Sequence, residues 1–286
     1  MAFGVMGGGI TADAGSGKIS ITGVATGSGS SNAQAISNYG SGFTLRSSSS
    51  NAQAISLIGD ANAATGGSSL GINFSGTIES TGTGGVSLIG AAGTASVEAG
   101  ITTGTANILA KSGAITMVGM NDSSNTGLNL GTVTLGFKSG TNVTTSSSNI
   151  ILKADAYGIG TTALNTTGTV EMYSLDTSAS FGTAPTLPAT FTMGTGVTGL
   201  TIGKTSNAAD MSISSLVNIA GPISVYGGRI TVNGNLTLLP SSVLTIELGG
   251  LAQGSGYDFI NVLGTATLAG TLNVNAWGGY VAAPGT

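Results

Sequence analysis

The 286-residue chain contains no cysteine, no histidine, one tryptophan, and only 7 basic and 11 acidic side chains. Without cysteine or histidine, disulfide scaffolds, the common zinc, haem and thiolate sites, and Ser-His-Asp or Cys-His catalysis are excluded. The basic residues are scattered singly from Lys18 to Arg229, so nucleic acid is not an expected partner. No run of 18 apolar residues occurs, and we therefore expect no transmembrane segment.

Glycine, by contrast, is abundant, with 50 residues, and 40% of the chain is hydrophobic. Short alternating pairs of apolar residues recur along nearly the whole length, separated by Gly, Ser, Thr and Asn. Examples are Val86/Leu88, Ile115/Met117, Ile150/Leu152, Val170/Met172, Leu200/Ile202, Ile223/Val225 and Leu244/Ile246. Alternation at period two is typical of a strand with one buried face, and the intervening residues favour turns. The pattern predicts an all-β chain of many very short strands.

One octapeptide is repeated: SSNAQAIS occupies residues 30–37 and again 49–56, an offset of 19 residues. Between residues 211 and 246 three apolar pairs also fill about 19 residues, and such fixed spacings are typical of solenoids. We therefore predict one domain over residues 1–286, a right-handed parallel β-helix with three short strands per coil of about 19 residues. Asn32 would then stack on Asn51 and Ile36 on Ile55. About 15 coils would give a rod of roughly 70 Å.

The clearest family resemblance lies in residues 199–286, where a Tyr-Asp pair leads into a strand followed by the pattern G-x-A-x-L-x-G-x-L-x-V. The residues that carry it are Tyr257, Asp258, Gly264, Ala266, Leu268, Gly270, Leu272 and Val274. This segment resembles the β-helix passengers of filamentous-haemagglutinin-like adhesins and autotransporters. The resemblance implies a secreted or cell-surface bacterial protein with a structural or adhesive role. It implies no reaction and no cofactor, and the expected partner is a receptor or glycan on a host or neighbouring cell.

An enzyme must still be weighed, because polysaccharide lyases and hydrolases also use the parallel β-helix. Their sites need convergent carboxylates, often beside a basic residue. The densest candidate is Lys153, Asp155 and Glu171, for which we favour a surface ion pair between neighbouring coils. Asp258 is interpreted as a turn residue that bonds its own backbone. We therefore expect no enzyme, and we assign no catalytic, cofactor-binding or metal-binding residue.

Scattered aromatic residues leave a further alternative open. Tyr39, Tyr157, Tyr173, Tyr226 and Trp277 could line a sugar-binding groove. The favoured interpretation is that these single aromatics close turns or stack between coils.

The two ends of the sequence bear on assembly. Residues 1–10 are apolar and glycine-rich without the basic start of a signal peptide, and residues 277–286 form a short irregular tail. Neither looks like the polar cap that usually covers the open strand edge of a solenoid. Two expectations follow, continuation into further coils of a longer chain or a homo-oligomer formed by end-to-end stacking. In the second case the chain would be a subunit of an extracellular filament.

Overall fold

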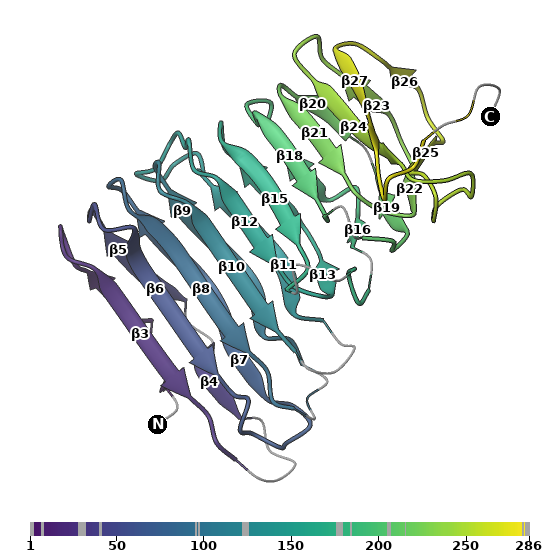
Figure 1. Ribbon diagram of the computed structural model, residues 1–286. Coiled ribbons are helices and arrows are strands. Elements are labelled where there is room, and N and C mark those ends of the chain that lie inside the picture. Colours follow the sequence, from purple (N-terminus) through teal and green to yellow (C-terminus); the bar gives the residue numbers. More distant parts are fainter. Residues whose placement is uncertain are drawn as a thin grey trace.

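The computed structural model describes the chain apart from residues 1–2, 7–8, 28–32, 40–41, 95, 97, 122–125, 176–179, 184, 205–206, 215, 282 and 284–286. The described residues form no helix, and their strands pair in parallel, coil upon coil. Figure 1 shows the resulting rod, with the first strands at one end and the last at the other. The predicted all-β parallel solenoid is therefore confirmed.

One sheet of ten strands runs the whole length of the rod (Figure 1). Its members, in order along the rod, are β3 (Ile19–Val24), β6 (Gln53–Asp60), β8 (Gly85–Ala91), β10 (Ile115–Met120), β12 (Ile150–Lys153), β15 (Thr169–Tyr173), β18 (Gly199–Ile202), β21 (Pro222–Val225), β24 (Val243–Leu248) and β27 (Thr271–Ala276). We call this sheet the long face.

The remaining strands form the other two faces. In the first two-thirds of the chain they join in one bent sheet: β1 (Phe3–Met6), β2 (Thr11–Asp13), β4 (Gln34–Tyr39), β5 (Phe43–Ser47), β7 (Leu70–Ser80), β9 (Ile101–Ala110), β11 (Leu128–Gly136), β13 (Tyr157–Ile159), β14 (Thr162–Asn165) and β17 (Phe191–Met193). Toward the C-terminus two sheets are separate. One contains β16 (Thr186–Leu187), β19 (Met211–Ile213), β22 (Arg229–Val232) and β25 (Phe259–Val262), and the other β20 (Leu216–Ile219), β23 (Leu236–Leu238) and β26 (Ala266–Thr267).

Three strand positions per coil, as predicted, explain the bent sheet. The first half of β7 pairs with β4 and its second half with β5. Between the halves lies Gly76, whose φ of 117° is a conformation that side chains other than glycine rarely adopt. The strand thus turns a corner at Gly76 and covers two faces.

The predicted coil length of 19 residues holds only locally. Met211 pairs with Ile230, 19 residues on, but Ile19 pairs with Ile55 and Ile115 with Ile150, 36 and 35 residues on. Stacked strands are typically about 29 residues apart. Loops of variable length between faces cause the difference. Nine strand spacings of about 4.8 Å along the long face therefore give a rod of roughly 40 Å, shorter than predicted.

The predicted stacking of the octapeptide repeat is wrong. Ile36 on β4 pairs with Ile72, whereas Ile55 on β6 pairs with Ile19 and Val86. The two copies therefore lie on different faces and not on top of each other. Asn32, the other residue expected in this ladder, lies outside the described residues.

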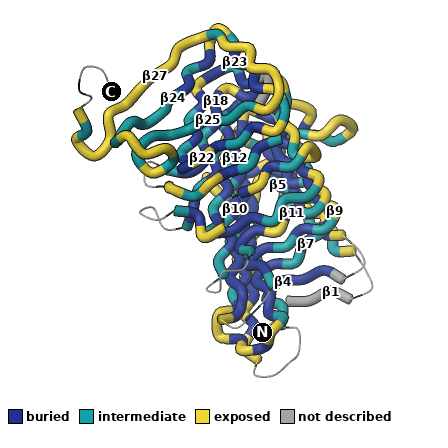
Figure 2. Tube along the Cα trace, turned by 90° about the vertical axis from the view of Figure 1, so that its right-hand side faces the viewer, coloured by how far each residue is buried: buried dark blue, intermediate teal, exposed yellow. Residues whose placement is uncertain are grey.

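Aliphatic ladders fill the interior. Along the long face the in-register row consists of Ile55, Val86, Ile115, Ile150, Val170, Leu200 and Ile223. All seven are buried, with at most 1% of their surface exposed. Figure 2 shows the buried column along the rod and the change to exposed residues at β27. Burial of these rows supplies the main driving force for folding.

A long insertion follows β11 and is held by a buried carboxylate. Glu79 on β7 accepts a hydrogen bond from the backbone N–H of Val143 at 2.9 Å. The other carboxylate oxygen of Glu79 lies 3.4 Å from Nε of Arg46 on β5. These two contacts of Glu79 thus fix residues 137–149 to the wall of the rod. The anchored segment belongs to one of the longest coils.

Candidate functional site

The predicted grouping of Lys153, Asp155 and Glu171 does not form. Asp155 lies beyond the end of β12, where the chain has already turned, so it does not share a face with Lys153. Its Oδ1 accepts a hydrogen bond from the backbone N–H of Leu175 at 2.8 Å. The expected ion pair is also wrong, because within the described part of the chain Lys153 forms no ion pair with a carboxylate.

Glu171 has other partners. It pairs in register with Ile151, and its Oε1 accepts a hydrogen bond from the hydroxyl of Thr169 at 3.3 Å. The three candidate residues thus serve separate local contacts, and no pair of convergent carboxylates exists at this position.

Asp258 bonds a neighbouring strand and not its own backbone, which corrects the turn interpretation. Its Oδ2 accepts a hydrogen bond from the backbone N–H of Glu247 at 2.7 Å, and its own N–H donates to the carbonyl of Glu247 at 3.0 Å. Between them the chain makes a hairpin, closed by an antiparallel bridge between Leu248 and Tyr257. Residues 249–256 form its tip. Asp258 therefore fastens the base of a hairpin that projects from the rod.

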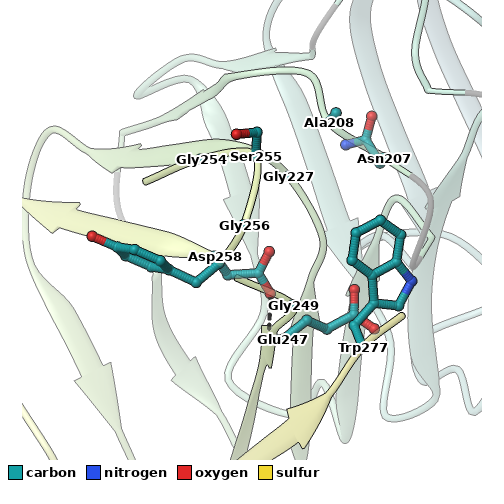
Figure 3. A pocket seen from close by; sticks show the side chains of 11 residues that line it. Asn207, Ala208, Gly227, Glu247, Gly249, Gly254, Ser255, Gly256, Asp258 and Trp277 are labelled. Carbon is teal, nitrogen blue, oxygen red and sulfur yellow. Dashed lines mark hydrogen bonds between the residues drawn. The ribbon is translucent and has the colours of Figure 1, made fainter. Parts of the chain in front are cut away.

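A small pocket lies against this hairpin (Figure 3). Its walls include the Glu247 and Asp258 side chains, the indole of Trp277 and the amide of Asn207. Trp277 follows β27 in the next coil, and its backbone N–H donates a hydrogen bond to the carbonyl of Leu248 at 2.9 Å. The indole packs against Gly249, where a Cβ atom would lie 2.6 Å from the ring. Glycine at 249 is thus required for this close approach.

Both carboxyl groups of the pocket have raised pKa values. Partial burial raises the pKa of Glu247, and the charge of Asp258 adds to this effect. Burial also raises the pKa of Asp258, against the opposing effect of hydrogen bonds from the backbone of Glu247 and Gly227. Two neighbouring carboxylates in one small pocket therefore favour uptake of a proton.

This arrangement predicts that lower pH stabilises the region. A carboxyl group whose pKa is higher in the folded state than in the unfolded state binds protons preferentially when folded, so stability rises as pH falls through the raised pKa values. We expect the urea midpoint followed by Trp277 fluorescence to be higher at pH 5 than at pH 7. The difference should shrink in the E247Q/D258N double variant. A midpoint difference of the same size in that variant would contradict the assignment.

The pocket is too small for a substrate. Its volume is about 50 Å³, room for a few water molecules, whereas sites for small ligands span about 300–1,000 Å³. The side-chain amide of Asn207 is already engaged within the protein. It donates a hydrogen bond to the carbonyl of Tyr226 at 2.6 Å and accepts one from the backbone N–H of Phe181 at 3.2 Å. Among the residues that the structure describes, no group of three or more acidic side chains could hold a metal ion. The pocket thus acts as a support for the hairpin.

A second, larger hollow lies on the outer surface of the long face. We call it the tyrosine–lysine groove; its volume is about 490 Å³, and it is lined by Lys153, Tyr173, Thr201, Gly203, Lys204 and Tyr226. The ammonium group of Lys204 lies 5.1 Å from the centre of the Tyr173 ring, within range for a cation–π interaction. Lys153 pairs in register with Tyr173. Two of the five aromatic residues considered for a sugar groove are therefore brought together here.

The other three aromatic candidates lie elsewhere. Tyr157 is buried, and its hydroxyl donates to the carbonyls of Leu152 and Tyr173 at 3.0 and 2.6 Å, so it links neighbouring coils as the favoured interpretation predicts. Trp277 belongs to the hairpin pocket. The side chain of Tyr39 lies outside the described residues. Glu247 and Lys204 were not anticipated as neighbours of these aromatics, because their approach depends on the lengths of the intervening coils.

Comparison with known proteins gives one partial relative. A segment of 66 residues, 22% of this chain, is 42% identical to the adhesin BmaC autotransporter of Brucella suis biovar 1 (strain 1330). The chain spans 2% of that protein's length. No protein-family model and no solved structure matches. In the described residues, no helix has the length and hydrophobicity to cross a membrane. The fold and this relative together agree with an adhesin-like β-solenoid.

Proposed function

We propose that the chain is a non-catalytic, adhesive rod displayed on or secreted from a bacterial cell. The observation that carries the proposal is the continuous parallel solenoid in a chain that shares 42% identity over 66 residues with an autotransporter adhesin. The outer rows of the long face supply further support. In the row that contains Glu171 most members are hydroxyl or amide residues, among them Ser20, Ser56, Ser87, Thr116, Thr201, Ser224, Thr245 and Asn273. Ser56 and Ser87 are buried, but the other members of the row reach the outer surface, and such a polar row suits contact with another surface.

Adhesion is tested with beads coated with the purified chain and applied to cultured host cells and to bacterial layers. We expect retention well above that of beads coated with the heat-denatured chain, because the binding surface exists only in the stacked coils. Equal retention of both kinds of bead would overturn the adhesive role.

Absence of catalysis is tested separately on a panel of polysaccharides. The hairpin pocket holds the paired carboxylates, so E247Q/D258N is the matched variant. We expect no cleavage by the native chain. Turnover that is lost in this variant would instead support the polysaccharide-cleaving alternative.

A filament subunit is the second candidate, favoured by the last strand of the rod. β27 pairs with β24 along one edge, and no described strand pairs with its other edge. Leu272 and Val274 continue the interior rows of the long face but are 59% and 53% exposed. An open edge with exposed apolar residues favours stacking of another solenoid. A further coil of a longer chain would cover this edge equally well, and the filament candidate takes a second copy of this chain as the occupant.

End-to-end stacking predicts that L272E reduces self-association, because the charge would lie at the interface. The measurement is light scattering after size-exclusion chromatography over a concentration series. I58E is the matched control, since Ile58 is 37% exposed but lies on the side of the rod. A native chain that stays monomeric at all concentrations, or an equal effect of both substitutions, would overturn the filament candidate.

A further inference from the structure

We infer that the tyrosine–lysine groove binds a carboxylated saccharide, which rests on and deepens the proposed adhesive function. The first argument is charge. The chain has a formal net charge of −4 with only 7 basic residues, yet Lys153 and Lys204 both line this groove. No carboxylate is among the lining residues. A local positive site on a negative protein selects for an anionic ligand.

The second argument is the arrangement of the aromatic rings. Tyr173 on β15 and Tyr226, directly after β21, lie two coils apart along the same face, with Gly203 in the coil between them. Gly203 has a φ of +77° and no side chain, and a Cβ atom there would lie 2.7 Å from the carbonyl of Tyr226. The space between the tyrosines therefore stays open. The resulting hollow has a volume of about 490 Å³ and is broadly open to solvent.

The third argument is that the Tyr173 ring is held in place before any ligand binds. Burial, together with the neighbouring carboxylate of Glu171, which interacts with the hydroxyl, raises the pKa of Tyr173 to about 12. The phenol thus stays neutral at physiological pH, and Lys204 lies over its ring. Fixed aromatic rings pack against the C–H faces of sugars at low entropic cost. The two ammonium groups then supply partners for a sugar carboxylate.

Glu171 lies beside the groove and reduces its positive charge, but the two lining ammonium groups outnumber this one carboxylate. Its carboxylate is engaged by the hydroxyl of Thr169 at 3.3 Å and by Tyr173, and it is not part of the groove lining. Thr201, in register with Glu171, contributes a hydroxyl to the wall. A ligand in the groove would therefore meet two cations, two phenol rings and a hydroxyl.

Binding is tested by titration calorimetry of the full chain at low salt with four probes: an oligogalacturonate, sialyllactose, a heparin oligosaccharide and neutral cellohexaose. Heparin carries sulfates as well as carboxylates, so it distinguishes the two groups. We expect oligogalacturonate and sialyllactose, whose only charges are carboxylates, to bind more tightly than cellohexaose, and binding to weaken as sodium chloride rises. K153A and K204A should each weaken it about three- to tenfold, and Y226A by a similar factor. K111A is the control, since Lys111 is exposed and outside the groove, and should leave affinity unchanged.

The outcomes separate the two proposals. If the native chain holds beads on cells but binds no carboxylated probe, or if K111A and K204A have equal effects, the groove assignment is overturned while the adhesive role stands. If only heparin binds, the ligand is a sulfated saccharide and the carboxylate assignment is wrong. If carboxylated probes bind but coated beads are not retained, the groove assignment stands and the adhesive function fails.

Discussion

Replacement of Gly90 by alanine is expected to lower the free energy of unfolding by about 3 kcal/mol or more, the upper end of the usual cost of overpacking. Gly90 lies on β8 and is buried. A Cβ atom there would lie closer than 3.0 Å to the backbone carbonyl of Gly100 and 2.6 Å from Cγ1 of Ile101, and real Cβ atoms essentially never approach so closely. Because the carbonyl belongs to the backbone, relief requires movement of a whole strand.

The same crowding recurs in the neighbouring coils, so the strand cannot easily yield. Gly23, Gly59, Gly90 and Gly119 pair with one another in register along the long face. At each of them an added Cβ would collide with a backbone carbonyl that lies in a strand of the bent sheet or directly before one. These glycines thus form a ladder where two walls of the rod come into backbone contact. The ladder explains part of the high glycine content, which the sequence indicated only as turns.

The measurement is urea unfolding of G90A beside G67A. Gly67 is exposed and an added Cβ would meet nothing within 4 Å, so G67A should leave stability within about 0.5 kcal/mol of the native value. Both variants add the same methyl group, and only its surroundings differ. Equal midpoints for the two would contradict the close packing of the ladder.

Alternation of apolar residues was sufficient to predict the short strands, and the regular spacing of the apolar pairs, with the repeated octapeptide, led to the parallel stacking and the three positions per coil. It could not assign a strand to a face. Ala35 and Ile36 are buried on β4, and Ala54 and Ile55 are buried on β6. The two copies of the octapeptide thus occupy equivalent environments on two different faces. The local alternation specifies which side chains point into the interior. Because every face of the rod needs the same alternation, the pattern does not reveal which face a strand occupies.

The sequence did not reveal the length of each coil, and the contacts that build the pocket and the groove depend on these lengths. The insertion after β11 is rich in Ser and Thr, like the short turns elsewhere, and its anchor on Glu79 joins residues 64 positions apart. Likewise, Tyr173 and Tyr226 share a groove only because the chain between them has the length that places both on the same row, two coils apart. Lys153 was singled out for a carboxylate partner, but its neighbour across the coil is Tyr173. Such contacts follow from loop lengths, which have no periodic signal.

Replacement of Phe74 by alanine is expected to cost about 3–5 kcal/mol of unfolding free energy, through lost burial and the cavity left behind. Phe74 on β7 is fully buried and stacks on Phe43 of β5, with ring centres 6.0 Å apart and planes inclined by 19°. F74L keeps most of the buried volume, so the decrease in its free energy of unfolding should be clearly smaller. L268A is the control, because Leu268 is 68% exposed and should tolerate truncation within about 0.5 kcal/mol.

The part of the chain that F74A destabilises tests whether each coil is stabilised only by its neighbours. In stacked coils each turn contacts only its neighbours, so destabilisation spreads along the rod over a limited distance. Hydrogen exchange of F74A should therefore accelerate at the amides of Ile78 and Ile108, which belong to the same and the next coil. The amide of Ile223, several coils away on β21, should keep its native rate. Uniform acceleration over the whole chain would mean that the rod unfolds as one cooperative unit.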